Sequence, residues 1–117
     1  EAFQVDSETM IDAATAISGS GPGYVFYFAE ALAEGAIKLG FDENQARLLA
    51  SQTLLGSAKL LKTSSESAKE LRKKVTSPGG TTEAAINHFE SSELKKQLID
   101  GFQSAFLRSL ELAKISG

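Results

Sequence analysis

The sequence predicts an all-α fold, a helical bundle of about five to six helices. Apolar residues recur at helical spacing in six stretches, which is the main sequence signal of amphipathic helices. No stretch of four or more residues alternates convincingly between apolar and polar side chains, so strands are not expected. Clusters of Gly, Pro, Ser and Thr separate the stretches and give each helix a place to end.

The first two predicted helices meet at a glycine-rich turn. Asp6-Ser7 offers an N-cap for a helix over residues 9–18, and Gly19-Ser20-Gly21-Pro22 ends it. Pro22 suits the first turn of the next helix, where its missing N–H would have no intrahelical acceptor. Over residues 24–39 apolar side chains nearly encircle that second helix, so it needs cover on all sides. We expect a partner subunit to provide this cover.

The third and fourth predicted helices have clear boundaries. Gly40 is expected at the C′ position that ends the second helix. Asp42 and Gln45 form a variant capping box for a helix over residues 43–61. Small residues on one stripe of this helix (Ala46, Ala50, Thr53 and Ser57) would let another backbone approach closely. A short charged helix is expected over residues 66–75.

The last two predicted helices follow the sharpest break in the chain, Ser77-Pro78-Gly79-Gly80. One is expected over residues 81–90 and the other over residues 93–115, with Ser91-Ser92 as its cap. At the other end of the chain, Glu1–Val5 is a short apolar tail suited to leaving another domain.

The composition excludes several classes of function. The chain is 42% hydrophobic and 23% charged with a net charge of −3, which is typical of a soluble globular protein and gives no general attraction to nucleic acid or to a membrane. Cysteine is absent and His88 is the single histidine, so no metal site is expected. The absence of cysteine and of a signal-peptide pattern favours the cytoplasm. No GxGxxG or GxxxxGK[ST] motif offers a cradle for a nucleotide.

The segment 75–86 has the residues of an anion site. Gly79 and Gly80 let a ligand approach the main chain, and they precede a helix whose first N–H groups lack acceptors. Ser77, Thr81 and Thr82 add hydroxyl groups. This chemistry suits a small carboxylate or phosphate. An ordinary Ser/Thr-capped connection between two helices has the same local pattern, so the residues alone leave both interpretations open.

Two motifs resemble the signatures of one enzyme family. Thr76–Thr82 (TSPGGTT), followed by Ala85-Ile86, is similar to the substrate-loop signature of the pyrroline-5-carboxylate reductase family, and Asp12–Tyr24 (DAATAISGSGPGY) is similar to its second motif. Ala50–Ala58 also resembles the third helix of that family. The resemblance covers nearly the whole chain, with the motifs in the expected order.

The resemblance implies a domain organisation and a reaction. Residues 1–117 would form the C-terminal dimerisation and substrate-site domain, an interlocked homodimer similar to the C-terminal domain of 6-phosphogluconate dehydrogenase. A higher oligomer built from such dimers stays open as well. An N-terminal Rossmann domain, absent from this chain, would bind most of the NADP or NAD cofactor. The intact enzyme would reduce 1-pyrroline-5-carboxylate to L-proline, and the chain alone would be inactive because hydride donor and acceptor must be held together.

The resemblance also implies roles for individual residues. Ser77, Gly79, Gly80 and Thr81 would bind the substrate carboxylate, and Thr82 would be catalytic, with its hydroxyl on the ring nitrogen. Thr76 would lie towards the nicotinamide, as would the turn that contains Ser20, Gly21 and Pro22.

The chain departs from the family pattern at two places. Ser67-Ala68 stands where members often carry His-Pro, and Gly23 stands where many carry Ala. Glu66 lies near a position where an acidic residue of the family can help to shape the site. Two other functions stay open. One is the helical half of another Rossmann-coupled dehydrogenase, such as a hydroxyacid type, although no Lys lies on an obviously apolar helix face. The other is a helical interaction module without catalysis.

Overall fold

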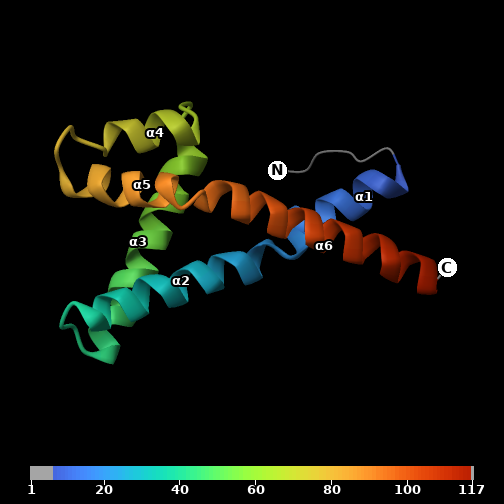
Figure 1. Ribbon diagram of the computed structural model, residues 1–117, viewed down its shortest axis with the longest axis horizontal. Coiled ribbons are helices and arrows are strands. Elements are labelled where there is room, and N and C mark those ends of the chain that lie inside the picture. The colour runs from blue at the N-terminus through green and yellow to red at the C-terminus, as the bar shows by residue number, and fades with distance from the viewer. Residues whose placement is uncertain (1–6, 117) are drawn as a thin grey trace. The chain divides into compact units, whose positions relative to one another are not determined.

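The computed structural model describes residues 7–116, which form six α-helices and one π-helical turn (Figure 1). Two compact units divide the chain. The first unit contains residues 7–24 and 89–116, and the second unit is Val25–His88. The predicted all-α fold and the number of helices are confirmed. The expected N-terminal tail, Glu1–Val5, and Asp6 lie outside the described residues.

The first helix is shorter than expected because it changes into a π-helical turn. α1 (Glu8–Ala14) starts at Ser7, whose hydroxyl accepts from the Met10 N–H. η1 (Thr15–Gly19) then replaces the last turn of the helix predicted over residues 9–18. The Ser20 N–H donates to the Thr15 carbonyl at 2.8 Å, which is the five-residue spacing of a π-helix. The Thr15 and Ser18 hydroxyls donate to carbonyls four residues back, and such bonds compete with the regular helical ladder.

In the first unit, α1 and η1 pack on α6 (Leu94–Ser116). Ala16 is 2% exposed, and its carbonyl accepts a 2.6 Å hydrogen bond from the Tyr24 phenol. The Tyr24 ring lies 4.8 Å from the Phe102 ring, measured between centroids. A 2.7 Å hydrogen bond from the Ser109 hydroxyl to the Asp12 carboxylate joins α6 to α1. These contacts fix the π-helical turn that leads into α2 (Gly21–Lys38).

In the second unit, α2 ends as predicted, in a glycine C-cap. Gly40 has a φ of 115°, a region that L side chains rarely adopt. The Phe41 N–H donates to the Ala36 carbonyl and the Gly40 N–H donates to the Ile37 carbonyl, which together form a Schellman motif.

α3 (Glu43–Thr63) begins with the predicted capping box between Asp42 and Gln45. Of its predicted stripe of small residues, Ala46 and Ala50 are buried, whereas Thr53 and Ser57 are exposed.

The remaining helices differ from the expected boundaries by one or two residues. α4 (Ala68–Lys74) starts after Ser67, two residues later than predicted, and α5 (Thr81–Ser91) ends one residue later. Ser91 is therefore the last residue of α5, and α6 starts only after Glu93, whose φ is 54°.

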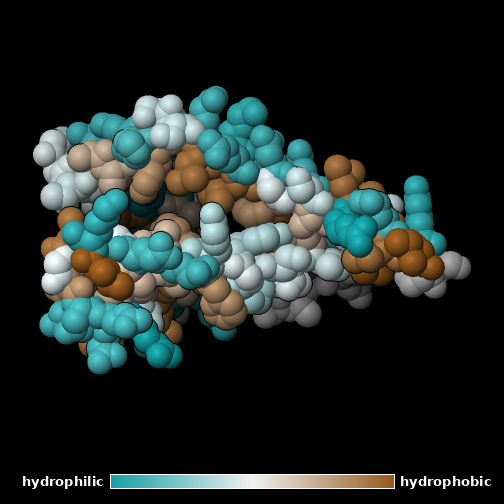
Figure 2. Space-filling view, turned by 60° about the horizontal axis from the view of Figure 1, so that its bottom comes forward, coloured by the Kyte–Doolittle hydropathy of each residue, from teal (hydrophilic) through white to brown (hydrophobic). Residues whose placement is uncertain are grey.

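Many large apolar side chains are exposed to solvent in both units. The buried residues in the described part of the chain are three alanines, Ala16, Ala46 and Ala50. None of the large side chains in this part is fully buried. Phe26 is 67% exposed, Tyr27 74% and Leu55 71%. Figure 2 shows such apolar side chains, in brown, at the surface beside hydrophilic ones. No helix among the described residues is long and apolar enough to span a bilayer.

Candidate functional site

The segment between α4 and α5 forms a β-turn of defined type. The Gly80 N–H donates to the Ser77 carbonyl at 3.0 Å, so Ser77 and Gly80 are the ends of the turn. Pro78 stands second, where its fixed φ is favourable, and Gly79 stands third with a φ of 73°. This is the geometry of a type II turn, in which the third residue needs a positive φ. Gly79 is therefore required by the backbone.

Gly80 leaves little room for a side chain. A Cβ atom on Gly80 would lie 3.2 Å from the Ser77 carbonyl oxygen, closer than nearly all real Cβ contacts. The Gly79 N–H donates to Oε1 of Glu83 at 2.9 Å, and the Gly80 N–H is held by Ser77. Both glycine amides are thus used inside the loop. The two glycines therefore determine the shape of the loop, and hydrogen bonds to a ligand have to come from other groups.

The open donors lie at the start of α5. The first backbone bond into this helix runs from the Ala84 N–H to the Gly80 carbonyl. Among the described residues, the N–H groups of Thr81, Thr82 and Glu83 have no protein acceptor, as expected for the first turn of a helix. These amides and the partial positive charge of the helix end favour an anion here.

Three hydroxyl groups at the loop are also open. Within residues 7–116, the side chains of Ser77, Thr81 and Thr82 take part in no hydrogen bond. Other Ser and Thr hydroxyls of the chain, in contrast, donate to backbone carbonyls of their own helix. Ser77 and Thr81 are exposed, and Thr82 is half-buried. The structure therefore brings together the residues that the sequence predicts for substrate binding, with their hydroxyls available.

The residues predicted near the nicotinamide lie in two places. Thr76 is half-buried, and its hydroxyl donates to the Arg72 carbonyl at 2.5 Å, at the end of α4. The Ser20-Gly21-Pro22 turn belongs to the first unit, where the Gly23 N–H donates to the Ser20 carbonyl at 3.0 Å. The assignment of Thr76 and of this turn to cofactor binding stays a prediction.

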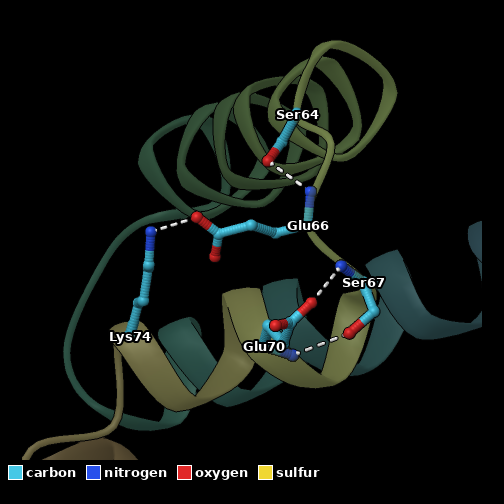
Figure 3. Close-up of polar contacts among 5 residues, drawn as sticks. All are labelled: Ser64, Glu66, Ser67, Glu70 and Lys74. Atoms are coloured by element: carbon cyan, nitrogen blue, oxygen red, sulfur yellow. Dashed lines mark hydrogen bonds and ion pairs between the residues drawn. The ribbon is translucent and has the colours of Figure 1, made fainter.

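Polar contacts fix the segment that precedes the loop (Figure 3). The Ser64 hydroxyl accepts from the Glu66 N–H at 3.0 Å, and the Glu66 carboxylate pairs with the Lys74 ammonium group. Ser67 caps α4 through a capping box with Glu70.

The capping box makes α4 sensitive to acid. The Ser67 N–H donates to Oε1 of Glu70 at 2.9 Å, and the Ser67 hydroxyl is the second contact of this carboxyl group. The two contacts, in that order of size, hold the pKa of Glu70 below its ordinary value of 4.5. Because the folded-state pKa is depressed, this stabilisation is complete above about pH 4.5 and is lost as the pH falls through the lowered pKa.

We expect Glu70→Gln to be less stable than the parent at pH 7, because the charged acceptor and its favourable place in the first turn are lost. Below about pH 4.5 the difference should shrink towards zero as Glu70 becomes protonated in the parent. Urea unfolding at several pH values and at equal protein concentration measures both. A difference that does not change with pH would contradict the assignment.

Two contacts of the site were missed by sequence reasoning. The capping box of Ser67 and Glu70 has the S-x-x-E pattern and could have been found from the sequence. The bond from Gly79 to Glu83 could not have been found from the sequence. It depends on the type II turn, which brings the Gly79 N–H within reach of the third residue of α5.

A separate hollow of about 420 Å³ lies between α2 and α3. It contains none of the loop residues. Glu30, Glu34 and Glu43 line it together with Arg47, so three carboxylates share the hollow with one cation. Among the described residues, no group of three acidic, His or Cys side chains is placed to hold a metal ion.

A family model described as pyrroline-5-carboxylate reductase dimerisation matches residues 8–112. The chain belongs to the pyrroline-5-carboxylate reductase dimerisation family. The match includes the segment between α4 and α5, the glycine-rich turn and all of α1 to α5. The resemblance predicted from the two motifs is confirmed.

Curated relatives are longer than this chain. A pyrroline-5-carboxylate reductase of Pseudomonas aeruginosa is 42% identical over 116 residues, which are 99% of this chain and 42% of the relative. A second, from Synechocystis, is 43% identical over 107 residues, which are 92% of this chain and 40% of the relative. The chain therefore spans about two-fifths of the length of these pyrroline-5-carboxylate reductases.

Solved structures match the dimerisation domain as well. A pyrroline-5-carboxylate reductase from Coxiella burnetii aligns with a TM-score of 0.88 and 45% identity, over 92% of this chain and 40% of that one. A pyrroline carboxylate reductase from Plasmodium falciparum, solved with NADP bound, aligns with a TM-score of 0.85 and 33% identity, over 89% of this chain and 40% of that one. The all-α dimerisation-domain fold is thereby shown.

Proposed function

We propose that this chain supplies the substrate-carboxylate pocket and the subunit pairing of a reductase that converts 1-pyrroline-5-carboxylate to L-proline. The observation that carries the proposal is the start of α5, where the Thr81 and Thr82 amides and the hydroxyls of Ser77, Thr81 and Thr82 have no partner among the described residues and stand in or next to a type II turn. The substrate has one carboxylate and one imine nitrogen, and the loop offers several donors for the first and a further hydroxyl for the second.

The carboxylate would be bound by the Ser77 hydroxyl and by the amides of Thr81 and Thr82. Both amides belong to the first turn of α5, so the end of the helix dipole would add to the attraction. Gly79 and Gly80 would contribute by their lack of side chains, since their own amides are bound to Glu83 and Ser77. Bonds to a charged carboxylate are the stronger kind of protein hydrogen bond.

Thr82 would place its hydroxyl on the ring nitrogen. Reduction of the imine needs one proton at nitrogen and one hydride at the neighbouring carbon. When bound, the reduced nicotinamide cofactor would supply the hydride. The Thr82 hydroxyl would donate a hydrogen bond to the nitrogen and pass on a proton from solvent, so no strong acid is required.

The described residues do not fit the main cradle of a dinucleotide. They contain no strand that leads through a glycine-rich turn into a helix, which is the usual pyrophosphate site. The Thr76 hydroxyl is already bonded to Arg72. We therefore assign most of the NADP or NAD binding to an N-terminal Rossmann domain acting with this chain. We call the combination the two-domain reductase, and we expect the chain alone to be inactive.

The open apolar faces support a homodimer as the working unit. In the described part of the chain only alanines are buried. Large apolar side chains such as Phe26 and Leu55 are exposed to water in the single chain. Exposed apolar surface in this amount favours an interaction site. A second copy would cover it, and assembly of dimers into a higher oligomer remains a prediction, as does the cytoplasmic location.

The Ser77→Ala variant of the two-domain reductase tests the pocket. We expect it to weaken L-proline binding by about 1–2 kcal/mol, because it removes one hydrogen bond to a charged carboxylate. Calorimetric titration measures the affinity. Ser51→Ala is the matched control, since the Ser51 hydroxyl bonds to the Leu48 carbonyl of its own helix.

An unchanged affinity in Ser77→Ala would remove Ser77 from the site. If all loop variants changed thermal stability alone, the alternative of a helical interaction module without catalysis would be favoured instead.

A further inference from the structure

Glu83 reaches back from the third position of α5 into the substrate loop. Its Oε1 accepts the Gly79 N–H at 2.9 Å, and Gly79 is the residue of the turn with a positive φ. The side chain is half-buried, and among the described residues its carboxylate belongs to no ion pair. The partners of this charge are thus the Gly79 amide and the positive end of α5.

The bond ties the central peptide of the turn to α5, in addition to the backbone bonds from Gly80 to Ser77 and from Ala84 to Gly80. Ser77 stands at the start of the turn, and Thr82 stands in the first turn of the helix. A turn with Pro-Gly at its centre can rotate its central peptide, and this rotation would redirect the Gly79 N–H. Glu83 holds that N–H from the helix side, so it fixes the turn relative to Thr81 and Thr82.

We infer that Glu83 is a positioning residue for substrate binding: by holding the Gly79 amide it fixes the spacing between Ser77 and the first turn of α5. The inference rests on the proposed function. We expect Glu83 to act on substrate affinity. Without Glu83 the loop would have to become ordered when the substrate binds, and the free energy of that ordering would lower the affinity.

Two substitutions separate the hydrogen bond from the charge. Glu83→Ala removes both the acceptor and the charge, whereas Glu83→Gln keeps an acceptor oxygen and removes the charge. In the two-domain reductase we expect Glu83→Ala to raise the KM for 1-pyrroline-5-carboxylate and the Kd for L-proline on the order of tenfold, with little change in kcat. We expect Glu83→Gln to restore most of this affinity.

Glu43→Ala is the matched control. Glu43 is the acidic residue in the first turn of α3, so its loss also removes a favourable charge from a helix start. It lies outside the loop, and its variant should keep the parent's KM.

A second measurement reports on the contact in the 117-residue chain itself. We expect the Gly79 amide to exchange with solvent deuterium more slowly than the amides of Thr81 and Thr82, and Glu83→Ala to remove the difference. Equal exchange of the three amides in the parent would overturn the inference, because the bond would then be absent. An unchanged KM in Glu83→Ala, or a KM in Glu83→Gln as high as in Glu83→Ala, would overturn it as well.

The outcome distinguishes this inference from the proposed function. If Ser77→Ala weakens proline binding and Glu83→Ala does not, the pocket is correct and the role of Glu83 is wrong. If neither variant changes proline binding, the proposed function itself fails.

Discussion

Replacing Thr82 by valine in the two-domain reductase is expected to lower the turnover of 1-pyrroline-5-carboxylate by about 10- to 100-fold. Valine has nearly the same shape but no hydroxyl, so the ring nitrogen would lose its hydrogen-bond donor and its path for a proton. The nitrogen that accepts this bond is neutral, and such a hydrogen bond contributes about 0.5–1.5 kcal/mol, with each 1.36 kcal/mol changing a rate tenfold. The loss of the proton path extends the expected effect towards about 100-fold. The Thr82 hydroxyl has no partner among the described residues, so its loss should disturb folding little.

Thr82→Ser is the matched control for this result, because it keeps the hydroxyl and removes the methyl group. We expect it to retain much of the parent's turnover. Steady-state kinetics and thermal unfolding on the same samples separate chemistry from stability. A Thr82→Val variant that loses thermal stability and keeps its turnover would refute the role at the ring nitrogen.

Replacing Phe26 by glutamate is expected to break the homodimer. Phe26 is 67% exposed in the single chain, so the chain alone predicts an almost neutral change. If a second copy covers the side chain, the variant buries an unpaired charge in the interface, which costs several kcal/mol. A cost of about 3 kcal/mol weakens association by more than 100-fold.

Sedimentation of the 117-residue chain at micromolar concentration measures this effect. The parent should sediment as a dimer, and Phe26→Glu should dissociate or unfold. Lys59→Glu, a charge change on the exposed surface of α3, should keep the parent's behaviour. A parent that is a stable monomer, or a Phe26→Glu variant that remains a folded dimer, would contradict the homodimer.

Most helix boundaries could be predicted because local chemistry determines them. Asp42 with Gln45 starts α3, and Gly40 ends α2 in the expected C′ position. The π-helical turn at Thr15 was not predicted. The Tyr24 bond to Ala16, which holds this turn, goes with the packing of Tyr24 against Phe102 of α6, and no local pattern encodes it.

The candidate site could be predicted in its residue types and not in its internal bonds. Pro78-Gly79 predicts a turn, and the helix after it predicts open amides. The structure adds that the amides of Gly79 and Gly80 donate to Glu83 and Ser77. The amides available to a ligand are therefore those of Thr81 and Thr82. Sequence reasoning missed this because it depends on where Glu83 lies in three dimensions.

The most direct test is a crystal structure of the two-domain reductase with L-proline bound. The proline carboxylate should lie on the Ser77 hydroxyl and the Thr81 and Thr82 amides, with the ring nitrogen at the Thr82 hydroxyl. Proline bound away from the start of α5, with these groups facing water, would contradict the assignment of the substrate pocket to this chain.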